Sequence, residues 1–333
     1  MATDNVKNTT LSTKPALRLG KDTVELLVML ALLIVSITVF SIMAPGFLSA
    51  GNFSSMAVQL PELGILSLAM FVPIISGGLN LSVTYTANIA GLTTAWLVKG
   101  ALVGAGIAAM PVAIAGGLVA GALAGLTIGV IVAYVGAHPI LVTLGAMIFL
   151  RGLGEFVTRG GGISGMPDAF QAMGSGSVFG IPIPMLIFLG AAAALAYFMQ
   201  FTRAGFSIHM LGSNLKATEY SAINVKKVLI ILYMISGLLS ALAGMVMLAR
   251  FNSVRIGHGE SYLLITVLAC FLAGSNPFGG FGRVLPLVLG LMSLQVIASG
   301  MNLMGASQHL ATAVWGGFLI IVMIVRAPFL KKS

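Results

Sequence analysis

GALVGAGIAAMPVAIAGGLVAGALAGLTIGVIVAYVGAHPILVTLGAMIFL, residues 100–150, contains no Asp, Glu, Lys or Arg. A helix needs roughly 20 apolar residues to cross the hydrocarbon core of a bilayer, so this run must hold about two crossings. Residues 63–98 and 284–325 are uncharged as well. The whole chain is 58% hydrophobic and 8% charged, whereas soluble domains carry about 25% charged residues. Lipid must therefore solvate much of its surface, and we predict an all-α polytopic membrane protein.

The apolar segments predict ten membrane crossings. We place them at 24–44, 57–76, 81–98, 104–134, 139–158, 182–200, 228–249, 262–273, 284–303 and 309–326. The eighth is short enough to be re-entrant or broken, and the fourth is long enough to tilt or kink. We expect one transmembrane domain over 24–326, with polar tails at 1–23 and 327–333.

The distribution of basic residues orients this topology. With the N-terminal tail in the cytoplasm, twelve Lys and Arg fall on the inside and four on the outside, as the positive-inside rule requires. Both termini and residues 201–227 are then cytoplasmic, and 159–181 is the largest external loop, whose glycines favour an irregular connection. The net charge of +9 is scattered among connecting segments, which indicates membrane topology and no nucleic-acid partner.

A polar interruption, FTRAGFSIHMLGSNLKATEYSAINVKK, spans residues 201–227. Its centre, 214–222, is predicted to form a short helix after a Gly-Ser-Asn turn. This segment gives the chain a surface for a soluble partner. The sequence contains no GxxxxGK[ST] phosphate loop, so nothing indicates that the chain itself hydrolyses nucleotide, and we expect a non-catalytic subunit.

Glycines recur every four residues at Gly117, Gly121, Gly125 and Gly129. Small residues on one face let membrane helices approach closely. We favour packing inside one subunit over a dimer seam.

Two segments have the composition of broken helices: residues 75–82, ISGGLNLS, and residues 273–282, AGSNPFGGFG. Unwound backbone at membrane depth is tolerated where protein or a water-filled cavity satisfies it. Each could be an ordinary interfacial turn, but their occurrence in both halves favours an internal repeat around a pathway. Asn80, Tyr85 and Asn88 are our pathway candidates, although each could instead make an interhelical hydrogen bond.

The few charged residues near the crossings leave an alternative open. Arg151 and Glu155 are spaced to pair on one helix face, and Glu62 follows Pro61 near an outer helix end where solvation should be easy. A proton-coupled secondary transporter would use Glu62 or Glu155 as its carrier. The four histidines show no ligand spacing with Cys or carboxylates, so we expect no metal site.

Four motifs, in order, resemble the permease subunits of ribose-type sugar ABC importers in bacteria. Residues 76–83, SGGLNLSV, are similar to the family's SGGIDLSVG, and HPILVTLG with the following LRG, 138–152, is similar to its P-x-[IV]-[VA]-T-L-G…RG stretch. Residues 212–225 and 272–282 resemble its cytoplasmic segment and its later glycine run. Asn80 stands where the family usually has Asp, and Thr84, Ala273 and Ala222 also depart from its glycines.

The resemblance implies a type II-like importer fold with an inverted repeat, in the bacterial inner membrane. It also implies a second permease subunit, a cytoplasmic ABC ATPase that binds ATP and Mg²⁺, and a periplasmic sugar-binding protein, with no cofactor on this chain. The solute would be a monosaccharide or a similar small polyhydroxylated molecule such as autoinducer 2. The family's coupling helix, which contacts the ATPase, matches the segment containing Gly212, Asn214, Ala217, Glu219, Tyr220, Ser221, Ile223, Asn224 and Val225.

Overall fold

The computed structural model describes residues 21–101, 109–307, 310, 313–318 and 320. Its α-helices are α1 (Lys21–Met43), α2 (Ala50–Ile75), α3 (Val83–Trp96), α4 (Ala109–Val130), α5 (Pro139–Thr158), α6 (Asp168–Ser175), α7 (Ile183–Phe201), α8 (Arg203–Ser213), α9 (Leu215–Tyr220), α10 (Val225–Phe251), α11 (Tyr262–Leu272) and α12 (Val284–Leu303). Two π-helical turns, η1 (Leu97–Ala101) and η3 (Ile131–Val135), continue α3 and α4. Short strands β1 (Ile163–Ser164), β2 (Ser177–Val178), β3 (Ile181–Pro182) and β4 (Ser253–Val254) lie in the connections.

The predicted all-α polytopic fold is confirmed. Within the described residues, seven helices are long and apolar enough to span a bilayer: α1, α2, α4 with η3, α5, α7, α10 and α12. The third predicted crossing is divided between α3, with 14 residues, and η1. The eighth is the 11-residue α11, so its predicted shortness is confirmed. The tenth, 309–326, lies largely outside the described residues, and the inverted repeat stays a prediction.

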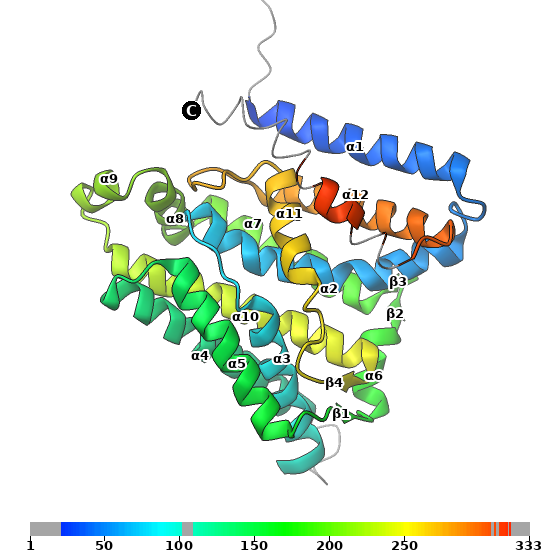
Figure 1. Ribbon diagram of the computed structural model, residues 1–333, viewed down its shortest axis with the longest axis horizontal. Coiled ribbons are helices and arrows are strands. Elements are labelled where there is room, and N and C mark those ends of the chain that lie inside the picture. The colour runs from blue at the N-terminus through cyan, green and yellow to red at the C-terminus, as the bar shows by residue number, and fades with distance from the viewer. Residues whose placement is uncertain (1–20, 102–108, 308–309, 311–312, 319, 321–333) are drawn as a thin grey trace, which may run out of the picture.

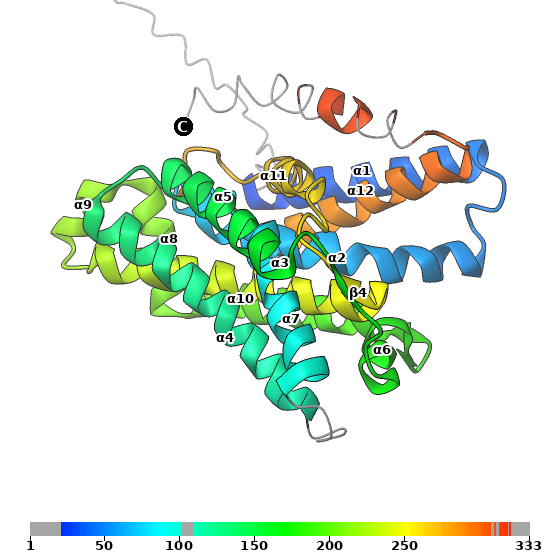
Figure 2. The same cartoon turned by 60° about the horizontal axis from the view of Figure 1, so that its bottom comes forward.

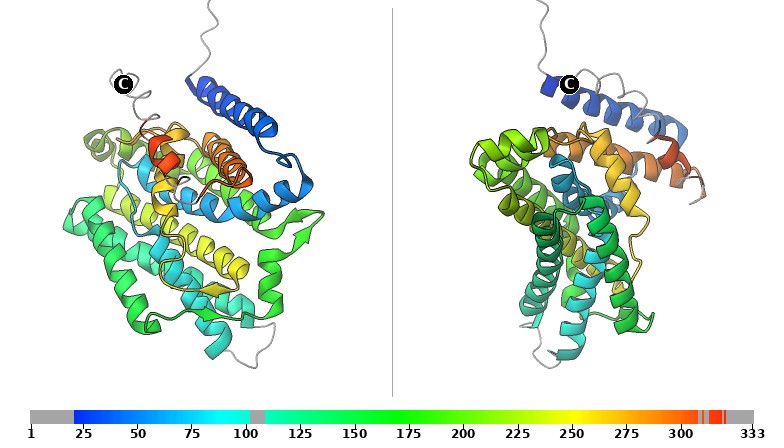
Figure 3. Two further views of the ribbon diagram at one scale, coloured as in Figure 1. Left: turned by 45° about the vertical axis from the view of Figure 1, so that its right-hand side comes forward. Right: turned by 60° about the vertical axis from the view of Figure 1, so that its left-hand side comes forward.

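The connections gather at two opposite ends of the helices (Figure 1). Helix α9 lies at one end, and α6 with the strands lies at the other. Figure 2 shows the same separation, with α10 running between the two ends. Helix α1 packs on α12 at the edge of the molecule (Figure 3).

Contacts at these ends agree with the predicted sides of the crossings. At the α9 end, the Gly280 amide donates to the Ile75 carbonyl at 2.8 Å, which joins the two predicted helix breaks. At the other end, β1 pairs with β4 in an antiparallel ladder. The two segments in each contact are separated by an even number of predicted crossings, so they are expected on the same side of the membrane. Their contact agrees with that expectation.

The connection at 159–181 differs from the irregular loop that its glycines predicted. It forms β1, α6 and β2, and the side chain of Phe170 on α6 is fully buried. Gly174 brings α6 so close to α10 that an added Cβ would clash with the backbone of Ala249. Tertiary packing on α10, which local sequence cannot report, orders this connection.

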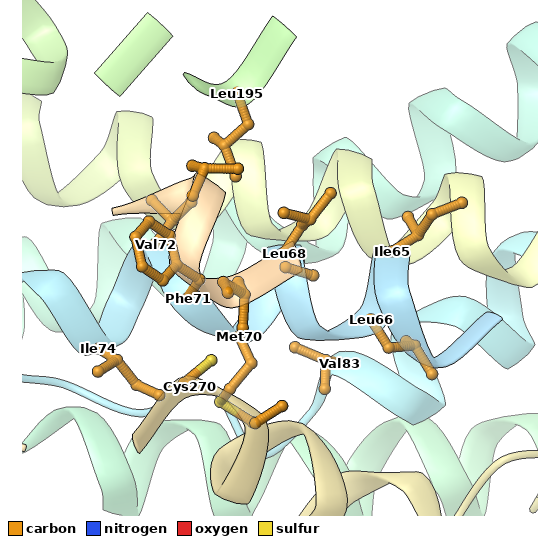
Figure 4. Close-up of a cluster of buried hydrophobic side chains, with 14 of the residues drawn as sticks. Ile65, Leu66, Leu68, Met70, Phe71, Val72, Ile74, Val83, Leu195 and Cys270 are labelled. Carbon is orange, nitrogen blue, oxygen red and sulfur yellow. The ribbon is translucent and has the colours of Figure 1, made fainter. Parts of the chain in front are cut away.

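Helix α2 lies at the centre of the bundle. Of its most apolar stretch, 89% is buried, compared with 17% for α5. Ile65, Leu66, Leu68 and Phe71 point into different parts of one apolar cluster (Figure 4). A helix that is hydrophobic on all sides belongs inside a core, and α2 is covered by α7, α10, α11 and α12.

The glycine face of α4 packs against α10, which confirms the prediction of packing inside one subunit. A Cβ at Gly121 would lie 2.6 Å from the carbonyl oxygen of Gly237, and one at Gly129 would lie 2.8 Å from the Cα of Ile230. The absence of side chains at these positions lets the two backbones touch.

Candidate coupling and pathway sites

The predicted cytoplasmic segment forms two helices, α8 and α9. The expected turn at Gly212 and Ser213 is wrong, because both residues are the last of α8. Asn214 then separates the helices and caps α9, its Oδ1 accepting from the amide of Ala217 at 3.0 Å. An Asn at this position satisfies one of the free amides of the first helical turn, so α9 begins where the sequence indicated.

Helix α9 presents most of its side chains outward. Tyr220 is 90% exposed and Leu215 is 50% exposed, and Ala217 and Glu219 are also exposed. Thr218 is buried on the inner side. The short helix is therefore held by one face and free on the other, as a docking element requires.

The rest of the predicted coupling residues form the connection to α10. Ser221 is exposed, whereas Ile223 and Val225 are half-buried and pack against the main apolar cluster. Asn224 caps α10, accepting from the amide of Lys227 at 3.1 Å. The two Asn caps fix where α9 and α10 begin.

Asn80 lies fully buried in the connection between α2 and α3. Its amide nitrogen donates to Ser236 Oγ on α10 at 2.8 Å, and its Oδ1 accepts from Ser82 Oγ at 2.7 Å and from the Ser82 amide at 3.1 Å. Ser236 in turn donates to the Ala69 carbonyl of α2 at 2.7 Å. These bonds join the unwound segment to α2 and α10.

Tyr85 lies on α3 beneath a group of charged side chains. The guanidinium carbon of Arg151 is 6.0 Å from the centre of its ring, and its hydroxyl lies close to the Glu260 carboxylate. Arg151 pairs with Glu155 at 3.1 Å, which confirms the predicted pair, and with Glu260 at 3.7 Å. The group connects α3 and α5 to the loop before α11.

Asn88, one turn along α3 from Tyr85, holds the same loop by its backbone. With its amide oriented to match donors to acceptors, its nitrogen donates to the His258 carbonyl and its oxygen accepts from the Gly257 amide, both at 3.1 Å. The structure therefore gives each pathway candidate protein partners, Asn80 on α10 and both Tyr85 and Asn88 in the loop before α11. Their role in a pathway stays a prediction.

Glu62 is not at a solvated helix end, as its place after Pro61 suggested. Its side chain has no exposed surface, and Oε1 lies 2.7 Å from an Arg250 guanidinium nitrogen on α10. The Tyr262 hydroxyl of α11 donates to Oε2 at 3.4 Å. The expectation failed because α10 and α11, which come far later in the chain, cover this position.

Comparison with known proteins identifies the chain. Residues 52–325 match the family model described as the permease component of branched-chain amino acid transport systems. The chain belongs to this permease family.

Two kinds of relatives cover nearly the whole permease. The ribose import permease protein RbsC of Escherichia coli strain K12 is 32% identical over 98% of each chain. The autoinducer 2 import system permease protein LsrD of Photorhabdus laumondii is 29% identical over 89% of each chain, and LsrD of Yersinia enterocolitica is 29% identical over 92% of each. No solved structure matches. The predicted resemblance to ribose-type permeases is confirmed.

The sequence does not predict two ion pairs that the structure shows, Glu62 with Arg250 and Arg151 with Glu260. Nothing in the sequence around Arg250 points to Glu62 as its partner. Glu260 gave no signal of its partnership with Arg151 and Tyr85. Both pairings join segments that are distant in the chain. Among the described residues, no three His, Cys, Asp or Glu side chains gather as metal ligands would.

Proposed function

We propose that the permease forms the translocation pathway of an ATP-driven importer for a monosaccharide or a similar small polyhydroxylated solute. The substrate class rests on the named relatives, whose names specify ribose and autoinducer 2 and which match nearly the whole length of the chain. The family description names branched-chain amino acids, so family membership alone does not choose the solute. In choosing the solute we give more weight to RbsC and LsrD, because they match nearly the whole length of the chain.

The observation that supports ATP coupling is the exposed α9, held by its inner face at one end of the molecule. The chain has no phosphate loop of its own, so a separate cytoplasmic ABC ATPase must supply ATP hydrolysis, with ATP and Mg²⁺ bound there. The outward face of α9 is its docking element, and this permease subunit is non-catalytic. Closure of the ATPase dimer would displace α9 and α8 and thereby change which side of the pathway is open.

The remaining partners follow from the same arrangement. The α9 end is cytoplasmic, as the distribution of Lys and Arg requires, and both termini lie on that side of a bacterial inner membrane. The opposite end, with α6 and the strands, receives the solute from a periplasmic binding protein. A second permease subunit completes the pathway.

A proton-coupled transporter is the weaker alternative. Both of its carrier candidates are paired with arginines, Glu62 with Arg250 at 2.7 Å and Glu155 with Arg151 at 3.1 Å. A carrier would have to break these ion pairs in every transport cycle.

The test is co-expression of the permease with the ATPase and binding protein of its source organism, followed by ribose uptake in proteoliposomes. Glu219→Arg or Ala217→Trp should abolish ATPase co-purification and ATP-dependent uptake, because both alter the exposed face of α9. Asp168→Arg, an equal charge reversal at the exposed start of α6 and far from α9, should leave ATPase co-purification intact. Uptake by the permease alone under an imposed pH gradient would instead support the proton-coupled alternative.

A further inference from the structure

Three segments that are far apart in the sequence meet at the α9 end of the molecule. They are the end of α2 with residues 76–78, the end of α8, and the turn at 276–282 between α11 and α12. The Gly280 amide donates to the Ile75 carbonyl at 2.8 Å, which joins the first segment to the third. We call this meeting point the glycine junction and define it by Gly77, Gly212, Gly279 and Gly280.

Gly212 of α8 fits between the other two segments. A Cβ there would clash with the carbonyl oxygen of Ile75 and would lie 2.5 Å from the Gly280 amide nitrogen. A Cβ at Gly279 would lie 2.6 Å from the amide nitrogen of Gly77 and 2.9 Å from the Cα of Gly212. The three backbones therefore touch with no side chain between them.

The two breaks also need glycine for their own conformation. Gly77 has φ +82° and Gly279 has φ +93°, values that residues with a Cβ rarely adopt. Gly212, by contrast, lies in regular α-helix. Close approach alone therefore explains glycine at 212, and no backbone strain would accompany Ala there.

A second contact ties α8 to the same turn. His209, one helical turn before Gly212, places its Nε2 3.4 Å from the Gly282 carbonyl oxygen. Its Nδ1 lies 3.0 Å from the Gly205 carbonyl within α8. The ring thus bridges the helix and the turn beside the glycine junction.

Direct backbone contact transmits displacement better than contact between flexible side chains, which can absorb it by changing rotamer. Only Asn214 separates α8 from α9, so a load on α9 reaches Gly212 across a few backbone bonds. A displacement of Gly212 acts directly on both unwound segments, because its backbone contacts each of them. These segments can change shape without loss of the regular bonds of the helices on either side.

We propose that Gly212 is the positioning residue through which the coupling segment moves both helix breaks together. This inference rests on the proposed function and deepens it, because it states where the force of the ATPase enters the membrane helices. Gly212 touches neither nucleotide nor solute. It acts by keeping α8 in backbone contact with the end of α2 and with the turn before α12.

The test follows the two breaks with thiol probes in the complete complex with its ATPase. The chain has a single cysteine, Cys270, so Cys270→Ala gives a permease without thiols, whose labelling is read from its own band after the subunits are separated. Phe278→Cys, at a side chain that is 77% exposed, reports on the turn before α12. Ser76→Cys, at a half-buried position, reports on the end of α2. The measurement is the rate of maleimide labelling with and without ATP plus vanadate.

With Gly212 intact, nucleotide trapping should change the labelling rates of both probes by about fivefold or more, a usual size for coupling between sites. In complexes that still capture the ATPase, Gly212→Ala should reduce the response of both probes to below about twofold. Gly190→Ala is the matched control, because it makes the same change in α7, where an added Cβ meets nothing within 4 Å. It should respond as the parent does.

Several outcomes would overturn the inference. One is a normal response of both probes in Gly212→Ala, and another is a response of one probe without the other in the parent. Loss of ATPase capture by a folded Gly212→Ala would also overturn it, because Gly212 would then shape the docking face. If Gly212→Ala does not fold, His209→Ala provides the test, since it removes the contact between α8 and the turn without adding volume. In this variant the nucleotide-dependent change in labelling rate should be at least halved. An unchanged response overturns the inference. Failure of the proposed function would appear in the parent protein itself, which would then capture no ATPase.

Discussion

Glu62 and Arg250 form a buried ion pair between α2 and α10, with 2.7 Å between carboxylate oxygen and guanidinium nitrogen and no exposed surface on Glu62. Tyr262 of α11 completes it by donating to the second carboxylate oxygen. One polar contact therefore joins α2 to α10 and α11, which come far later in the chain.

We predict that Arg250→Met destabilises the permease by about 3–5 kcal/mol, because it leaves the buried Glu62 charge without a partner. The double variant Glu62→Gln with Arg250→Met should recover much of this loss, since it removes both charges. Thermal unfolding in detergent measures the effect. A double variant no more stable than Arg250→Met would show that the pair contributes mainly through packing.

Asn80→Asp should weaken the connection between α2 and α10. An ionised Asp side chain cannot donate to Ser236, whose hydroxyl already donates to Ala69, so two acceptors would face each other in a buried place. We expect a loss of about 1–3 kcal/mol of unfolding free energy.

A double-mutant cycle with Ser236→Ala checks this reason. The two changes should be less than additive, because both disturb the same bond. Full additivity would mean that the introduced carboxylate acts through groups other than Ser236. The family's usual Asp at this position makes the comparison informative for related permeases.

Gly121→Ala should lower the stability of the permease by about 1–3 kcal/mol through overpacking against α10. An added Cβ would lie 2.6 Å from the Gly237 carbonyl and 2.5 Å from the Ala241 Cβ. Gly145→Ala on α5, where an added Cβ meets nothing within 4 Å, should have little effect. Thermal unfolding and size-exclusion chromatography report the two results. A changed oligomeric state with normal stability would favour a dimer seam instead.

Acid should destabilise the loop that joins α10 to α11. Burial lowers the pKa of His258, and the charge of Arg255 lowers it further, whereas in the unfolded chain the pKa is about 6.5. Between these two values the unfolded state binds more protons, so stability falls as the pH falls from about 6.5 through the folded pKa.

His258→Gln should flatten this dependence, because Gln does not titrate. Melting temperatures measured from about pH 7.5 to about pH 5, for the parent and the variant, give the comparison. Equal slopes in both proteins would assign the acid sensitivity to other groups.

Much of the fold was predictable because membrane helices follow simple rules of length and polarity. The uncharged runs, the glycines of α4 and the start of α9 are local features, and each appears in the structure as predicted. The Arg151–Glu155 pair was also predictable, since both residues lie on one helix face. In contrast, α8 was missed, although its buried residues Gly205, Ile208 and Leu211 recur three residues apart, as on one face of an amphipathic helix.

The candidate site was predictable only in part. Residues 212–225 could be selected from polarity and resemblance, but the exposed outer face of α9 and the buried Thr218 emerge from packing. The sequence suggested two helix breaks on one side of the membrane. Nothing in the sequence indicates that Gly212 lies between these two breaks in the folded protein.

The sequence by itself determined that this chain is a helical membrane protein, because apolar length and charge act locally along the chain. Only the tertiary structure decided which polar groups meet. Glu62 finds Arg250, Asn80 finds Ser236, and the Gly280 amide finds the Ile75 carbonyl across long stretches of chain. A buried polar group must be satisfied by whatever neighbour the fold supplies, and that neighbour depends on how all the helices pack together.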